Sequence, residues 1–133
     1  MSDIARDNSR DISGVIGGVK VLVCSPDGPK LSRERDANDL MSAAWEQSAS
    51  LVAIPVERLS ADFFHLSTRL AGDVLQKFVN HRLRVAIVGD VSVWTAKSKA
   101  LHDFVSESNG GQTVWFVRDL GDLERLLTSA QRA

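Results

Sequence analysis

The chain has 133 residues, 44% of them hydrophobic and 25% charged, which is the composition of one ordinary globular domain. Its 16 basic and 17 acidic residues give a formal net charge of −1, so it lacks the electrostatic footprint of domains that bind nucleic acid or anionic lipid. No apolar run reaches the roughly 20 residues of a membrane span, and one cysteine, Cys24, cannot form an internal disulfide. We therefore expect a cytoplasmic protein without nucleic-acid or membrane partners.

The first elements are a tail and a hairpin. Residues 1–11 are polar and charged and have no apolar signal-peptide core, so we expect a flexible N-terminal tail before a single domain at 12–133. The continuous apolar run 19–24 predicts a buried strand. Residues 12–16 are expected to pair with it across Gly17-Gly18.

A helix and a second apolar strand follow the turn residues 26–29, which read Pro-Asp-Gly-Pro. Apolar residues recur with helical spacing between 37 and 45, where the stripe ends on a tryptophan. Asp36 is expected to cap this helix at its start. The strand at 51–56 contains Pro55, which lacks an N–H group and should lie near the strand end or on an edge.

The next helix is amphipathic. Ser60 is expected to cap this segment, with Asp62 in its first turn, and an apolar stripe runs through residues 70–79. Gly72 within the stripe disfavours a helix, which suggests that another backbone approaches closely there. Residues 85–88 form a fully apolar strand.

The last third of the chain repeats the alternation. A Gly-Asp turn at 89–90 leads to a helix over 100–105, which the Asn-Gly-Gly sequence at 109–111 closes. Residues 113–117 predict the last strand, and a final helix over 119–127 begins on two aspartates spaced three apart. Strands that alternate with helices indicate an α/β domain, with a four- or five-stranded, mostly parallel sheet, four helices and right-handed crossovers.

One segment carries a family resemblance. Residues 62–92 read DFFHLSTRLAGDVLQKFVNHRLRVAIVGDVS and closely resemble the bacterial family catalogued as domain of unknown function 4180. The shared pattern has an acidic-Phe-Phe opening, a Leu-Gln-Lys-Phe run and an Ala-Ile-Val-Gly-Asp strand end. Arg69 departs from it, because the family usually has glycine there; if that glycine packs against a ligand, Arg69 places a cation in the space. The family has no assigned chemistry.

The element order is also similar to the STAS fold of sulfate-transporter and anti-sigma-antagonist domains. Those domains bear a regulatory serine or threonine where the third strand gives way to the second helix, a region that corresponds to residues 57–72. The resemblance therefore implies a phosphorylation switch, with Ser60, Ser67 and Thr68 as candidates. The alternative is that these hydroxyls cap the helix or bond locally. The Asp-Ser-Ser-Gly signature of STAS domains is absent.

We expect the helix opening at Phe63–Gly72 and the loop at Asp90–Ser98 to meet at one end of the sheet, because parallel strands place their following loops there. The leading hypothesis is a regulatory or binding module that acts through protein contacts, with a protein partner or a second copy of the chain on this surface. Aromatic residues would form the patch, unless they fold inward over the core. The candidate binding residues are Phe63, Phe64, His65, Ser67, Thr68, Arg69, Asp90, Trp94, Lys97 and Ser98.

The alternative hypothesis is an enzyme or a small-anion binder. His65 and Asp90 would form an acid–base pair, while Lys97 and Ser98 would hold an anion at a helix start. Asp90 could equally serve only to shape its loop. The sequence offers no nucleophile and no histidine pair with metal-binding spacing, so we predict no catalytic residue, metal or cofactor.

Overall fold

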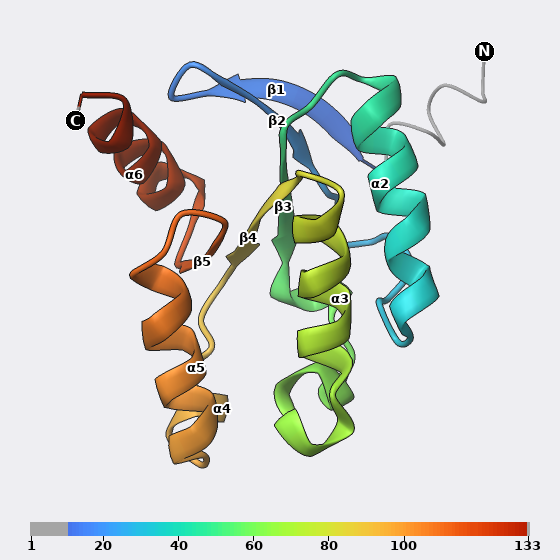
Figure 1. Cartoon of the computed structure of the whole chain (residues 1–133), viewed down its shortest axis with the longest axis vertical. Coiled ribbons are helices and arrows are strands. Elements are labelled where there is room, and N and C mark those ends of the chain that lie inside the picture. The colour runs from blue at the N-terminus through green and yellow to red at the C-terminus, as the bar shows by residue number, and fades with distance from the viewer. Residues whose placement is uncertain (1–10, 133) are drawn as a thin grey trace.

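The computed structural model describes residues 11–132, which form an α/β domain around one mixed sheet (Figure 1). Five strands lie side by side in sequence order, β1 to β5. The first pair is antiparallel and the other three pairs are parallel, which confirms the predicted, mostly parallel sheet. The strands are β1 (Ile12–Ile16), β2 (Val19–Val23), β3 (Leu51–Pro55), β4 (Arg84–Val88) and β5 (Val114–Val117).

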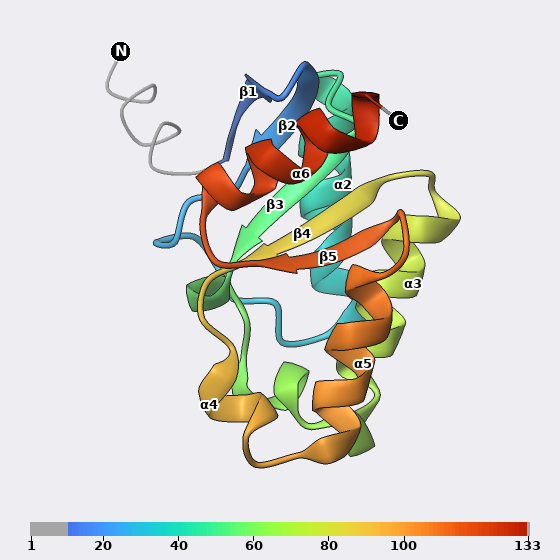
Figure 2. The same cartoon turned by 90° about the vertical axis from the view of Figure 1, so that its left-hand side faces the viewer.

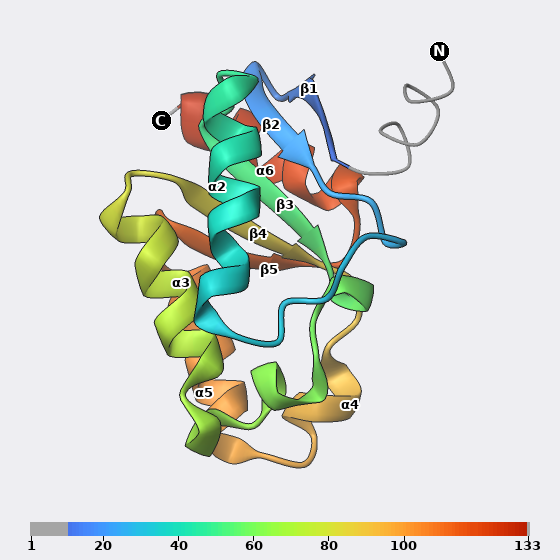
Figure 3. The ribbon, with the colours of Figure 1, turned by 90° about the vertical axis from the view of Figure 1, so that its right-hand side faces the viewer.

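The helices cover the two faces of the sheet unequally. Because the strand order runs in one direction and crossovers are right-handed, every crossover helix must lie on the same face. Figures 2 and 3 show α2, α3 and α5 on that face and α6 alone on the other. The helices are α2 (Ala37–Glu46), α3 (Leu70–Asn80), α4 (Ser92–Thr95), α5 (Lys99–Asn109) and α6 (Leu120–Arg132). No helix among residues 11–132 has both the length and the apolar character that crossing a bilayer requires.

Each face of the sheet has its own core, because alternate residues of a strand point to opposite sides. Leu22, Val52 and Val85 pack with α2, α3 and α5 in the larger core. Their neighbours on the strands point the other way, and α6 closes the smaller core there with Leu123 and Leu127. The continuous apolar strands of the sequence are thus explained by burial on both faces.

The predicted N-terminal hairpin is confirmed. Ile12–Ile16 pairs with Val19–Val23, and Gly17 and Gly18 turn the chain with φ values of 58° and 83°. The side-chain amide of Gln47 covers part of the outer edge of β1: Ser13 N donates to its Oε1 at 2.7 Å, and its Nε2 donates to the carbonyl of residue 11 at 3.2 Å. This contact fastens the hairpin to the end of α2.

The segment before α3 differs from the expected continuous helix. It contains two short 3-10 helices, η3 (Ala61–Phe64) and η4 (Leu66–Thr68), and α3 begins only after them. Ser60 does not cap through its side chain; its Oγ is buried and has no hydrogen bond among the described residues. Thr68 Oγ1 instead accepts from Leu70 N at 3.3 Å. The N-cap position of α3 is Arg69, which makes no side-chain capping bond, so the expected cap at Ser60 is wrong.

Two expectations about α2 are wrong. The carboxylate of Asp36 does not cap α2; it accepts from the backbone N–H groups of Ser32 and Arg33, which precede it. Trp45 lies at the end of the apolar stripe, yet it is 51% exposed and forms a T-shaped ring contact with His81, at 5.7 Å between ring centroids. Periodicity identifies the helix, but the helix turns its last apolar position away from the sheet.

The close approach of another backbone that we expected at Gly72 is wrong. A Cβ atom at this position would meet nothing within 4 Å, so no other backbone approaches it. Gly72→Ala should therefore raise the free energy of unfolding by about 0.5–1 kcal/mol, since alanine restricts the unfolded chain and favours the helix. Urea unfolding of the two proteins measures this difference. A less stable alanine variant would contradict the open space around Gly72.

Candidate functional site

The two segments expected to meet do come together at the carboxyl end of the sheet, in the lower part of Figure 3. The ring of Phe64, from η3, stacks on Trp94, from α4, with centroids 4.7 Å apart and an interplanar angle of 6°. His65 meets the same indole edge-on at 6.0 Å. These ring contacts hold the loops after β3 and β4 against each other.

Both adjacent phenylalanines are buried, which corresponds to the inward-folded alternative for these two rings. Phe63 packs in the larger core, while Phe64 is covered by the partly buried Trp94. The exposed side chains of these two loops are mainly polar. Val93 is the apolar exception, because it is 57% exposed. We call this the rim surface and define it by its exposed residues His65, Ser67, Thr68, Arg69, Val93 and Lys97.

Asp90 and Ser98 serve local structure. Asp90 Oδ1 accepts from Ser92 N at 2.8 Å, and hydrogen bonds from the Ser92 hydroxyl and backbone N–H hold the pKa of Asp90 below its usual value. Ser98 Oγ accepts from Leu101 N at 3.1 Å and caps α5. No hydrogen bond or ion pair joins Asp90 to His65 in the described chain. Five surface cavities in the described part of the chain are all lined by residues other than His65, Asp90, Lys97 and Ser98.

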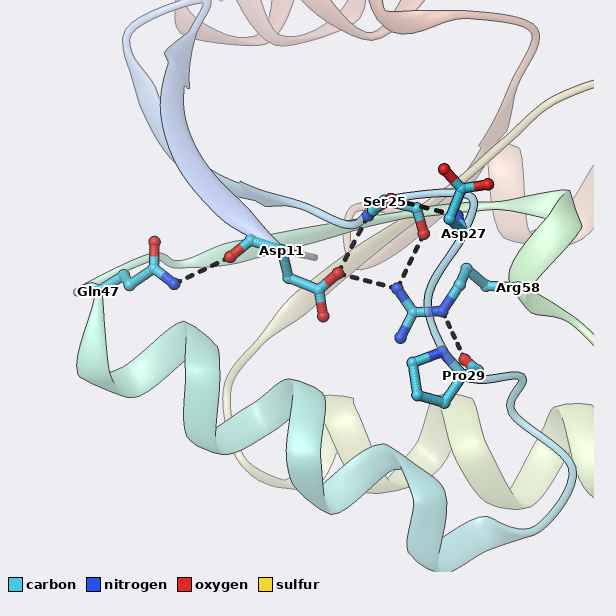
Figure 4. Close-up of polar contacts among 6 residues, drawn as sticks. All are labelled: Asp11, Ser25, Asp27, Pro29, Gln47 and Arg58. Atoms are coloured by element: carbon cyan, nitrogen blue, oxygen red, sulfur yellow. Dashed lines mark hydrogen bonds and ion pairs between the residues drawn. The ribbon is translucent and has the colours of Figure 1, made fainter. Parts of the chain in front are cut away.

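A second group of polar side chains lies at the same end of the sheet, beside α2. Arg58 is the third residue after β3 and, at 3% exposed, is the only buried charged residue among residues 11–129. Its Nε donates to the carbonyl of Pro29, and its Nη1 donates to Asp11 Oδ1 at 2.8 Å and to the carbonyl of Ser25 at 2.9 Å (Figure 4). The guanidinium thus ties the ends of β2 and β3 to the start of β1.

Asp11, the last residue of the expected tail, is held firmly in this group. Its side chain is 14% exposed, and Oδ1 also accepts from Ser25 N at 3.0 Å. Gly28 lies against the guanidinium: a Cβ there would stand 2.5 Å from the Cζ and Nη1 atoms of Arg58. Any side chain at position 28 would therefore push the guanidinium out of its present position.

The Arg58 pocket is a cavity of about 410 Å³ between this group and α2. Figure 4 shows Arg58 Nη2 and Asp11 Oδ2 on the side of the group that faces α2. Neither atom has a hydrogen bond within the described part of the chain. The pocket is lined by Asp11, Pro29, Lys30, Asp36, Asp39, Leu40, Ala43 and Arg58.

A family model described as domain of unknown function, DUF4180, matches residues 16–127. The chain belongs to this family. The match includes the whole segment that carries the resemblance in the sequence. Comparisons with curated proteins and with solved structures gave no match.

The backbone at position 69 suits the glycine that the sequence resemblance implies there. Arg69 adopts φ 67° and ψ 4°, a left-handed conformation that glycine reaches without steric cost. The residue joins η4 to α3, and its side chain is exposed rather than directed into a cavity. The glycine of the family pattern thus fits a backbone requirement, and Arg69 meets it at some cost in strain.

Sequence reasoning did not identify Arg58, Asp11 or Gly28 as members of one site in this DUF4180 domain. A signal existed for two of them, because Gly28 lies in the turn after β2 and Arg58 lies in the loop after the neighbouring parallel strand. Loops at the carboxyl ends of adjacent parallel strands lie side by side. Nothing in the local sequence singles out Asp11.

Cys24 lies next to this group and provides a chemical probe of it. Burial, followed by the charge of Asp11, raises the pKa of its thiol far above the usual value, although Arg58 acts in the opposite direction. A raised pKa keeps the unreactive thiol form at pH 8. We expect a disulfide reagent such as dithiobisnitrobenzoate to modify the folded protein at least about 100-fold more slowly than the urea-unfolded chain. Equal rates at pH 8 would contradict this burial.

Proposed function

We propose that this domain is a cytoplasmic regulatory or binding module that contacts a protein partner, or a second copy of itself, through the rim surface. The observation that carries the proposal is the stack of Phe64 on Trp94, which joins two loops far apart in the sequence into one surface. A surface held in advance loses less conformational entropy on binding than free loops would.

The composition of the rim surface supports a protein contact. Val93 projects from the four-residue helix α4, where burying it would remove apolar area from water. Arg69 and Lys97 are exposed and form no ion pair within residues 11–132, so their charges are free to meet a partner. An apolar centre with charged neighbours is the usual arrangement of a protein interface.

A phosphorylation switch, implied by the STAS resemblance, is part of the proposal, and Ser67 is its favoured site. The Ser67 side chain is exposed and makes no hydrogen bond in the described chain. Thr68 Oγ1 lies 2.7 Å from the carbonyl of Asp62 and is already engaged, while the Ser60 hydroxyl is buried. A phosphate on Ser67 would lie two positions from Arg69, which could pair with it.

The second hypothesis, an enzyme or anion binder built on His65, Asp90, Lys97 and Ser98, has less support. Asp90 and Ser98 already bond to backbone N–H groups that start helices. An anion at this place would have to compete with the Asp90 carboxylate. This hypothesis stays a prediction without a geometric argument in its favour.

Site-specific photocrosslinking tests the protein-contact proposal. The photoreactive residue benzoylphenylalanine is introduced at Val93 or Ser67 and, as the control, at Gln112, which is exposed just before β5 at the opposite end of the sheet. We expect Val93 and Ser67 to give an adduct of the same mass in cells of the source organism, and a second copy of the chain would double the mass.

Arg69→Gly tests the contribution of the charge at the rim surface, because it removes the cation and keeps the left-handed backbone. We expect it to weaken the adduct without lowering the unfolding midpoint. Adducts that are absent at both rim positions, or equally strong at Gln112, would overturn the proposal.

A further inference from the structure

At the Arg58 pocket, one nitrogen of a largely buried guanidinium is left without a hydrogen bond in the described chain. Two nitrogens of the guanidinium are satisfied by Asp11, Ser25 and Pro29, but Nη2 has no partner in the described chain. A hydrogen bond from a charged nitrogen is stronger than one between neutral groups, so an anionic acceptor at Nη2 would be bound favourably. The side chain is also fixed by three hydrogen bonds, so Nη2 is held in place before any ligand arrives.

An acceptor lies on the same side as this donor. Asp11 uses only Oδ1 for Arg58 and Ser25, and Oδ2 is left toward α2, as is Nη2 (Figure 4). A complementary ligand carries a hydrogen-bond acceptor for Nη2 and, close beside it, a hydrogen-bond donor for Oδ2. The carboxylate and ammonium groups of an α-amino acid have this arrangement.

The charges around the pocket argue against a simple anion. Asp36 and Asp39 add negative charge to that of Asp11, against the cations of Arg58 and Lys30. Lys30 Nζ already donates to the carbonyl of Glu57 at 3.0 Å. Backbone N–H groups of Ser32 and Arg33 bond to Asp36 and keep it ionised. The walls therefore favour a ligand that also carries positive charge.

Size and the apolar wall limit the ligand further. The cavity of about 410 Å³ lies at the small end of the range for small-molecule sites. Leu40 and Ala43 of α2 give it an apolar side, against which a short aliphatic chain can pack.

We propose that the Arg58 pocket binds a free α-amino acid, whose carboxylate accepts from Arg58 Nη2 and whose ammonium group donates to Asp11 Oδ2. The side chain of the ligand extends along Leu40 and Ala43 toward Asp36 and Asp39, so a basic amino acid binds best. This site is separate from the rim surface and does not depend on the proposed protein contact.

Nuclear magnetic resonance titration of the ¹⁵N-labelled protein tests the proposal with five probes: L-lysine, L-leucine, L-glutamate, acetate and methylamine. We expect saturable shifts at residues that line the pocket, with affinities in the order lysine, leucine, glutamate. Acetate and methylamine should each bind at least about 10-fold more weakly than lysine, because each supplies half of the ligand.

Three variants keep the buried Arg58 group intact. Asp39→Lys reverses an exposed charge at the pocket and should weaken lysine binding about 10-fold. Asp73→Lys is the matched control, since it reverses an exposed aspartate in the first turn of α3, outside the pocket, and should change binding less than about twofold. Ala43→Phe places a ring in the cavity and should abolish binding of all amino acids.

Several results would overturn the amino-acid site. These are no saturation by any amino acid below about 10 mM, shifts centred away from the pocket, or acetate binding as tightly as lysine, which marks an adventitious ion only. Equal losses in Asp39→Lys and Asp73→Lys would also overturn it, because they would place the ligand outside the pocket.

Discussion

Arg58→Met is expected to lower the free energy of unfolding by about 3 kcal/mol, because it removes one partner of a buried ion pair and leaves the other behind. Methionine retains most of the side-chain volume but donates no hydrogen bond. The change leaves Oδ1 of Asp11 with the bond from Ser25 N alone, and it removes the donor from the carbonyls of Ser25 and Pro29. Desolvated acceptors without donors are the main source of the cost.

Urea unfolding followed by circular dichroism measures this loss. Arg33→Met is the matched control: it makes the same chemical change at an exposed arginine and should shift stability by less than about 0.5 kcal/mol. Asp11→Asn should cost less than Arg58→Met, since the amide oxygen can still accept from the guanidinium. A loss below about 1 kcal/mol in Arg58→Met would show that water reaches the group in solution and that the pocket is not preorganised.

Gly89→Ala is expected to cost about 3 kcal/mol, by two separate mechanisms. Gly89 has φ 139°, a backbone region that L side chains rarely adopt, which accounts for about 1–3 kcal/mol. A Cβ atom there would also stand 2.7 Å from Cγ2 of Val56, the first residue after β3, and overpacking of this kind adds about 1–3 kcal/mol. The turn after β4 and the loop after β3 are therefore fitted closely to each other.

A second substitution separates the two mechanisms. In Val56→Ala/Gly89→Ala the steric conflict is relieved, while the backbone strain that alanine brings to the turn remains. We expect the double variant to be more stable than the sum of the two single losses predicts, by at least about 0.5 kcal/mol. Gly14→Ala is the control, because a Cβ there meets nothing within 4 Å. A Gly89→Ala protein as stable as the parent would refute the close fit at the strand end.

The Gly-Asp pair at residues 89–90 shows what a motif can and cannot establish. Its position after an apolar strand predicts a turn at a ligand-binding edge, and the turn is present. Both residues have structural roles: Gly89 leaves room for the side chain of Val56, and Asp90 accepts a hydrogen bond from Ser92 N. The motif locates the correct edge of the sheet, but the Arg58 pocket at that edge uses other side chains.

The elements and their order could be predicted because each depends on nearby residues. Strands buried on both faces read as continuous apolar runs, crossover helices show an apolar stripe, and Gly17-Gly18 marks a hairpin turn. The sequence also predicted that two loops would meet, those at Phe63–Gly72 and Asp90–Ser98, since parallel strands put their following loops at one edge. Periodicity alone could not show that Trp45 faces outward or that Gly72 lies in open space.

The sequence by itself determined an α/β domain of the DUF4180 family and the edge of the sheet where its loops gather. Only the tertiary structure decided that Arg58 is buried and that Asp11, 47 positions away, neutralises it. The physical reason is that a charged residue after a strand looks the same in sequence whether water or protein surrounds it. Its environment is set by contacts between distant segments, and those contacts exist only once the sheet has formed.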